Sequence, residues 1–245
     1  MGFLTTLKAN QAYRLHASGK IDEAKEAYKA AYDGGLNAPK LLLAFALLLL
    51  REGEYEHAVE VLRKAEKAPG IKDEQKTQII SYYAIAIFKQ GKLDRALELL
   101  RELFQKRKTG VLYGTLGLLL IEKAERIAAE SGDTEEAQAA VDEALAFNLE
   151  AVDYDEDDPV CLDNLAQTYF RLLEDKTTAR VYFDRALARK PGAIDTNFFL
   201  SLYDLEEGKN EEAAEKLETA AAGRFSPMNF ATPEMVKTQL DKLRI

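Results

Sequence analysis

Residues 51–65 read REGEYEHAVEVLRKA, and the same order of small and bulky residues returns three more times along the chain. The other copies are ASGKIDEAKEAYKAA (17–31), KQGKLDRALELLREL (89–103) and EEGKNEEAAEKLETA (206–220). In each copy an alanine stands five residues after a glycine, and a bulky residue follows four positions later. Glycine can end a helix because it adopts the left-handed conformation without a clash, and alanines at helical spacing let two helices approach closely. The pattern therefore predicts a repeated unit of helix, turn and helix.

Two further copies are weaker but keep the same order of residues. They contain Ala179, Phe183, Ala186 and Pro191 in one case, and Gly132, Ala137, Val141 and Ala144 in the other. With six copies, the chain resembles the tetratricopeptide repeat (TPR) family, whose first helix carries a small residue at its middle. The matching residues are Ala12, Ala46, Ala84, Gly117, Ala166 and Ser201.

The resemblance implies an all-α fold, a right-handed α-solenoid of six helix–turn–helix repeats that forms a single domain over residues 1–245. The repeats are predicted at 5–38, 39–76, 77–109, 110–158, 159–193 and 194–224. A capping helix is predicted at 232–244, because Thr232 and Pro233 form a helix start and a terminal repeat needs a cover. Met235, Leu240 and Leu243 are expected on its buried face.

The fourth repeat is longer than the others in both of its helices. Its first helix has about eight extra residues between the central Gly117 and the turn at Gly132, and its second helix has about seven. At 1.5 Å per residue, this predicts a helical hairpin about 11 Å longer than its neighbours. A loop insertion would instead have interrupted the helical periodicity of this stretch.

The stretch LLLAFALLLL, Leu41 to Leu50, is apolar all round, although a helix packed on a core needs only one apolar face. Ten residues are too few to span a membrane, and no transmembrane segment is expected. In the family that this chain resembles, first helices line a concave groove, so we expect the second side of this helix to face that groove. The residues expected to line it are Tyr13, His16, Leu43, Leu47, Leu50, Arg51, Ile85, Phe88, Lys89, Leu118, Ile121, Phe170 and Arg171.

An apolar groove of this kind matches the apolar face of a partner helix. We therefore expect a protein-binding adaptor or scaffold that holds a partner segment, an apolar or amphipathic helix. Three alternatives remain open at this point. The groove residues can contact one another or the C-terminal segment, the same surface can form a homodimer or a self-associating structural solenoid, or the groove can hold a lipid or another apolar ligand.

Composition and motifs limit the other classes of function. The formal net charge of −9 disfavours nucleic acid as a partner. Cys161 is the single cysteine, which permits no internal disulfide and fits a cytoplasmic location. The two histidines lie in different repeats, so no metal site and no cofactor is expected, and no catalytic motif indicates an enzyme. The basic and asparagine side chains with which some family members grip a terminal carboxylate are also absent from the matching positions.

Overall fold

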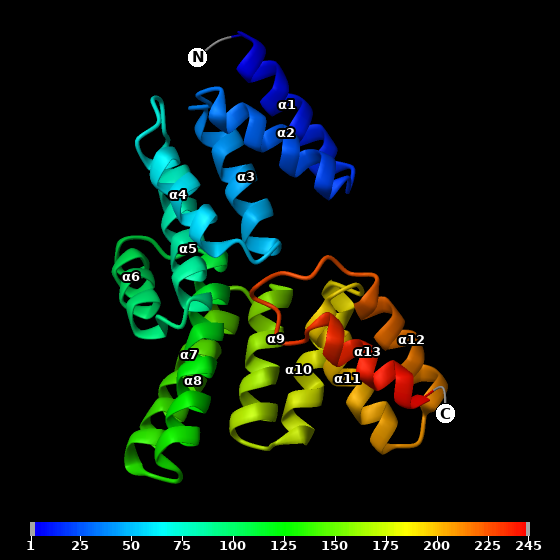
Figure 1. Cartoon of the computed structure of the whole chain (residues 1–245). Helices are drawn as coiled ribbons and strands as arrows, with labels where there is room; N and C mark the ends of the chain where they lie inside the picture. The colour runs from blue at the N-terminus through cyan, green and yellow to red at the C-terminus, as the bar shows by residue number, and fades with distance from the viewer. Residues whose placement is uncertain (1–2, 244–245) are drawn as a thin grey trace. The chain divides into compact units, whose positions relative to one another are not determined.

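A computed structural model describes residues 3–243, and every regular element in that part of the chain is a helix (Figure 1). The helices pair as antiparallel hairpins and divide into two compact units, an N-terminal unit that ends at Lys106 and a C-terminal unit that begins at Arg107. Each unit is described by itself. The predicted all-helical fold is confirmed, whereas a single solenoid over residues 1–245 stays a prediction.

The N-terminal unit contains three hairpins whose boundaries follow the repeat pattern. They are α1 (Phe3–Ala17) with α2 (Ile21–Asp33), α3 (Pro39–Arg51) with α4 (Tyr55–Glu66), and α5 (Asp73–Lys89) with α6 (Leu93–Lys106). The repeated alanines are fully buried, among them Ala12, Ala24, Ala46 and Ala58. Gly53 has a φ of +75°, the left-handed conformation that ends α3. The alanine and glycine positions therefore have the roles that the sequence predicts.

The C-terminal unit contains three more hairpins and a final helix. They are α7 (Gly110–Ser131) with α8 (Glu135–Tyr154), α9 (Pro159–Gln167) with α10 (Lys176–Arg189), and α11 (Ile194–Glu206) with α12 (Asn210–Ala221), followed by α13 (Pro233–Leu243). A π-helical turn, Thr168–Leu172, continues α9.

The long fourth hairpin is confirmed. Helix α7 has 22 residues and α8 has 20, against 13 and 12 for α3 and α4. Figure 1 shows the tip of this hairpin beyond the adjacent end of α9 and α10. Gly114 and Gly117 let α9 and α8 approach α7, because a Cβ at Gly114 would lie 2.8 Å from Val160 and one at Gly117 would overlap Asn148.

Three local details add to the sequence prediction or differ from it. Helix α5 begins at Asp73, four residues before the predicted repeat start, and the π-helical turn after α9 was not predicted. Helix α13 packs on α12 as the predicted cap, with the Thr232 hydroxyl accepting the N–H of Met235. Its deepest residue is Val236, while Met235, Leu240 and Leu243 are only partly buried.

Candidate functional site: the open face of the inner helices

Helix α3 leaves one narrow stripe uncovered. It contacts α1, α2, α4 and α5, and these neighbours bury eight of its thirteen residues. From Lys40 onward, the residues that stay open are Lys40, Ala44, Leu47 and Arg51. Their spacing of four, three and four residues places them on one side of the helix. An apolar sequence thus exposes two apolar side chains between two cations.

The first helices of the two neighbouring hairpins, α1 and α5, also expose residues at repeat positions that match the open residues of α3. On α1 the match to Leu47 is Tyr13, which is 40% exposed, and on α5 the open residues include Tyr82 and Lys89. The Lys40 Nζ lies 5.2 Å from the Tyr13 ring centroid, which joins the stripes of α1 and α3. Helices α3 and α5 pack against each other, and burial raises the pKa of Tyr82, against the hydrogen bond with Gln78 and the charge of Arg51.

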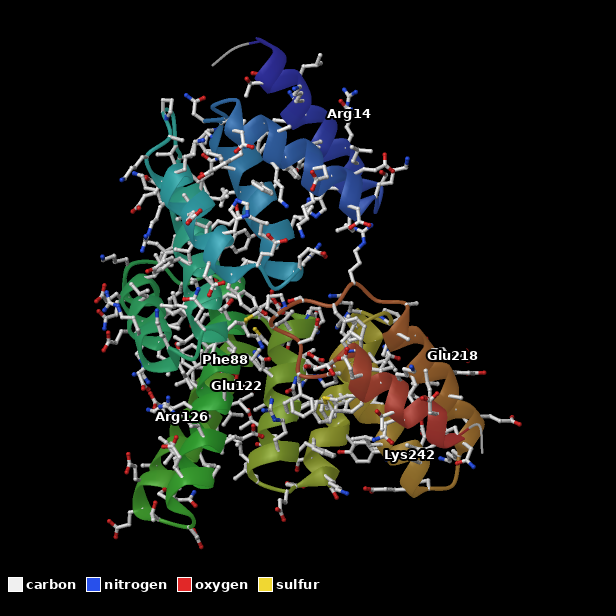
Figure 2. The ribbon with its side chains drawn as sticks, viewed as in Figure 1. Arg14, Phe88, Glu122, Arg126, Glu218 and Lys242 are labelled. Carbon is white, nitrogen blue, oxygen red and sulfur yellow. The ribbon has the colours of Figure 1, made fainter. Side chains whose placement is uncertain are left out.

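Phe88 on α5 is half-buried (Figure 2). The Lys89 Nζ lies 4.9 Å from its ring centroid, so we include Phe88 with the exposed residues of α5. We call the whole set the N-terminal stripe. It comprises Tyr13, Lys40, Ala44, Leu47, Arg51, Tyr82, Phe88 and Lys89.

Charge is distributed unequally between the two units and between the helices. The chain up to Lys106 carries 17 Lys and Arg against 14 Asp and Glu, a net +3, whereas the rest carries 16 against 28, a net −12. Helices α1 and α3 contain no acidic residue, and α5 contains only Asp73 and Glu74 in its first turn. The acids of the N-terminal unit lie mainly on the second helices of its hairpins, whereas α1 and α3 are cationic and α5 has two acids and two lysines.

Five of the nine residues predicted for the groove in this unit lie on the N-terminal stripe. They are Tyr13, Leu47, Arg51, Phe88 and Lys89. The expected exposure of the other four is wrong, because their exposed fractions are 8% for His16, 4% for Leu43, 1% for Leu50 and 8% for Ile85. The His16 ring meets the Tyr28 ring edge-on at 6.2 Å. The open side of α3 is turned away from the predicted one, so Lys40 and Ala44 replace Leu43 and Leu50.

In the C-terminal unit the predicted groove residues are covered. Leu118 is 6% exposed and Ile121 is fully buried on α7. Phe170 packs against aromatic rings of the core, with its ring centroid 5.0 Å from that of Phe199. The side chain of Arg171 is 5% exposed. The prediction of an open groove is therefore wrong at Leu118, Ile121 and the Arg171 side chain, whereas Phe170 is partly buried.

Arg171 connects α9 to α7 through ion pairs. Its Nη2 lies 2.8 Å from Glu122 Oε1, and its Nε donates to Glu125 Oε1 at 2.8 Å. Its Nη1 donates to Gln167 Oε1 at 2.8 Å, and the Gln167 amide donates to Asp163 at 2.7 Å. A chain of charge-assisted hydrogen bonds therefore occupies the inner side of α9.

A segment of the same chain fills the inner side of α11. Asp195 accepts hydrogen bonds from the backbone N–H of Phe230 at 3.2 Å and of Ala231 at 2.9 Å, and from the side-chain amide of Asn229 at 3.0 Å. The Phe230 ring stacks on Phe199 with centroids 5.0 Å apart. The alternative in which the C-terminal segment contacts the groove residues therefore holds for α11 in the C-terminal unit. There, the segment between α12 and α13 covers the side of α11 that was expected to face the groove.

Two buried carboxylates in this network have unusual pKa values. Burial, with a smaller contribution from the charge of Asp195, raises the pKa of Asp163 to about 7. Burial also raises the pKa of Asp195, against the hydrogen bonds that it accepts from Asn229 and the backbone. Both carboxylates are more than 90% covered, so neither can reach a substrate in this structure.

The described chain also contains one thiol, which is buried. Burial raises the pKa of the Cys161 thiol to about 12, which keeps it protonated and unreactive at neutral pH. Between residues 3 and 243, no cluster of three or more His, Cys, Asp or Glu is placed to hold a metal ion. In the same range, no helix has the length and apolar character needed to cross a membrane.

Sequence reasoning placed the charge of Lys40 near the groove but did not include Lys40, Ala44 or Tyr82 among its lining residues. A signal for them existed, because Lys40 and Arg51 are the only charges of α3 and stand eleven residues apart, three helical turns on one side. The residues that close the C-terminal unit, Asn229 and Phe230, had no such signal because their contacts are with residues more than thirty positions away.

Comparison with known proteins agrees with this architecture. A family model described as a tetratricopeptide repeat matches residues 39–69, which are helices α3 and α4. A search of curated proteins finds no match. A thermophilic TPR protein from Thermus thermophilus is 17% identical, with a TM-score of 0.66 over 84% of this chain and 99% of that one.

Two larger solved structures also match. A chain of the APC/C hetero-tetramer Cut9–Hcn1 is 16% identical, with a TM-score of 0.61 over 98% of this chain and 42% of that one. A monomeric mutant of IFIT1 with m7Gppp-AAAA is 20% identical, with a TM-score of 0.66 over 96% of this chain and 53% of that one. At these identities the likeness establishes a shared fold.

Proposed function

We propose that this tetratricopeptide repeat protein is a non-enzymatic adaptor that binds a segment of another protein on its N-terminal stripe. The observation that carries the proposal is the half-open Leu47, which lies with Ala44 between Lys40 and Arg51 on an otherwise buried helix. Such a surface, apolar at its centre and polar at its rim, has the anatomy of a protein interface.

The size of the stripe suits a helix of three to four turns. Lys40 and Arg51 are eleven residues apart, which is about 16 Å along α3 at 1.5 Å per residue. A partner helix with apolar residues at i, i+3 or i+4, and i+7 can cover Leu47 and Ala44 together with apolar side chains of the adjacent first helices. Burial of each large side chain contributes about 1.5–3 kcal/mol before the costs of association.

The C-terminal unit contains an example of the proposed binding mode, in which a first helix holds a segment of the same chain. There, the inner face of α11 holds an extended segment of chain through Asp195 and the stacked rings of Phe199 and Phe230. The repeat pattern that builds α11 also builds α3, and on α3 the corresponding face is open. The Cut9–Hcn1 assembly, with the same fold, is a complex of proteins.

The proposal includes a cytoplasmic location and the absence of a catalytic function. The buried and protonated Cys161 is compatible with a reducing compartment. Nucleic acid is disfavoured by the net charge of −9, although the IFIT1 structure with the same fold holds a capped RNA fragment.

A capture experiment tests the proposal. Leu47→Asp introduces a charge at the centre of the stripe, and Val181→Asp, at a 56% exposed position on α10, is the matched control. Proteins retained by the wild-type chain and by Val181→Asp, but lost from Leu47→Asp, would support binding at the stripe. Identical retention by all three proteins, with equal helical content by circular dichroism, would count against it.

Self-association is a second candidate, favoured by the opposite net charges of the two units. A basic unit of one copy can attract the acidic unit of another. Light scattering at about 100 μM protein separates the two functions, because a strict monomer at that concentration removes the structural role. Native mass spectrometry of the same sample would reveal a co-purified lipid, the signature of an apolar-ligand function.

A further inference from the structure

The charges of the N-terminal stripe limit the class of partner more narrowly than the apolar residues at the centre of the stripe do. Lys40, Arg51 and Lys89 are exposed on the stripe, and no acidic residue belongs to it. Arg14 is also exposed on α1 (Figure 2). These exposed cations stand on α1, α3 and α5 of a chain whose net charge is −9, so their sign is opposite to that of the chain as a whole.

From this distribution we infer that the stripe binds an acidic amphipathic helix. The inference rests on the proposed function and adds the charge of the partner to it. The partner carries apolar residues at its centre and Asp or Glu side chains near both ends, because cations flank Ala44 and Leu47 on both sides. Opposite charges at an interface rim increase the rate of association and select the partner more than they add affinity.

Two of the cations are held by aromatic rings. The Lys40 Nζ lies 5.2 Å from the Tyr13 ring centroid, and the Lys89 Nζ lies 4.9 Å from the Phe88 ring centroid. For Lys40, the ring beneath the ammonium restricts the side-chain stem and leaves the other side of the ammonium for an oxygen ligand. Lys40 therefore loses less conformational freedom when a carboxylate binds.

The second helices of the hairpins in the same unit, α2, α4 and α6, have a different pattern of charges. Their basic residues are interspersed with acids and form ion pairs with them, such as Lys25 with Glu54 and Arg95 with Glu98. Within the described chain, no salt bridge joins Lys40 or Arg51 to an acidic residue. The charges of Lys40 and Arg51 therefore give the stripe a positive potential, which an acidic segment neutralises.

An acidic helix fits this surface better than RNA does. Three or four cations are few for a phosphate backbone, and the two side chains at the centre of the stripe, Ala44 and Leu47, are aliphatic. The same aliphatic centre favours the apolar side chains of a protein segment.

Fluorescence anisotropy with three designed peptides tests the inference. The peptides are labelled helices of about sixteen residues with the same apolar residues, and their flanking positions are all Glu, all Gln or all Lys. They are titrated at low and high salt with the wild-type chain, with Lys40→Glu/Arg51→Glu, with the outer-face control Lys92→Glu/Arg95→Glu, and with Leu47→Asp. Circular dichroism checks that each variant is folded.

The inference predicts that the wild-type chain binds the Glu peptide at least about tenfold more tightly than the Lys peptide, and that added salt reduces the difference. The variant Lys40→Glu/Arg51→Glu should bind the Lys peptide more tightly than the Glu peptide. The control Lys92→Glu/Arg95→Glu should keep the wild-type order of affinities. Equal affinities, a preference for the Lys peptide, or no binding of the Glu peptide up to about 100 μM would overturn the inference.

The same assay compares the Glu peptide with RNA, with lipid vesicles and with a second copy of the chain. Tighter binding of a twelve-nucleotide single-stranded RNA or of phosphatidylserine vesicles than of the Glu peptide would overturn the inference, as would dimerisation through the stripe that excludes the peptide. Equal binding of the Glu and Gln peptides, lost in Leu47→Asp, would overturn the acidic partner and leave the proposed function standing. Unchanged peptide binding by Leu47→Asp would instead count against the proposed function.

Discussion

The guanidinium carbon of Arg171 lies 4.3 Å from the ring centroid of Phe230. The same guanidinium forms ion pairs with Glu122 and Glu125 on α7. One side chain at the end of the α9 hairpin therefore contacts both the long fourth hairpin and the segment that covers α11. The closed inner face of the C-terminal unit depends on this three-way contact.

Phe230→Ala should release the covering segment. The substitution removes the ring that stacks on Phe199 and on Arg171, and we expect the free energy of unfolding to fall by about 2–4 kcal/mol. Hydrogen exchange measures the local effect, because the Ala231 N–H is bonded to Asp195 and should exchange faster. Val181→Ala, at an exposed position, is the control. Unchanged protection at Ala231 would show that the ring does not hold the segment.

Asp163 should make the stability of the chain depend on pH near neutrality. Its pKa is raised by burial to about 7 in the folded state from an ordinary value near 3.8, so the folded state binds the proton more tightly than the unfolded state. The stability that this proton contributes is present at low pH and is lost as the pH rises through about 7, by at most about 1.4 kcal/mol per pH unit.

Urea unfolding of the wild-type chain and of Asp163→Asn at pH 5.5 and at pH 7.5 measures this effect. Asn cannot ionise, so the variant should lose less stability than the wild type between the two pH values. Asn can also pair with the Thr196 hydroxyl and the Gln167 amide, the two groups that donate to Asp163. Equal loss of stability in both proteins would place the titration elsewhere.

Gly117→Ala should destabilise the packing of α7 against α8. The new Cβ would overlap the Asn148 carboxamide and lie 3.3 Å from the Asn164 amide nitrogen. Overpacking of this kind costs about 1–3 kcal/mol, against a gain of up to about 1 kcal/mol from the better helix propensity of alanine. Gly192→Ala is the matched control, because its Cβ would meet no atom within 4 Å and its φ is not left-handed. Thermal unfolding compares the two variants, and equal midpoints would contradict the close contact.

The repeat architecture could be predicted because its determinants are local. Gly53 and Ala58 mark the turn and the close helix contact within one hairpin, and the equal lengthening of two helices identified the long fourth hairpin without any tertiary information. The start of α5 at Asp73 was missed because the register was taken from Ala84, and helix length varies from repeat to repeat.

The open surface was predicted less well, because it depends on how neighbouring helices cross. Leu43, Leu47 and Leu50 are equally apolar, and only the positions of α1 and α5 decide that Leu47 stays open. The closure of the C-terminal unit could not be predicted either, since Asp195 and Phe230 meet through a segment without regular structure.

The central claim is that a partner protein touches the N-terminal stripe, and site-specific photocrosslinking tests it most directly. A benzoyl-phenylalanine is placed at Ala44 in the stripe or at the exposed Glu60 on the outer helix α4. Illumination in cells that make the protein should give a covalent adduct with one partner from position 44 and none from position 60. An adduct of equal yield from both positions, or from position 60 alone, would contradict the account.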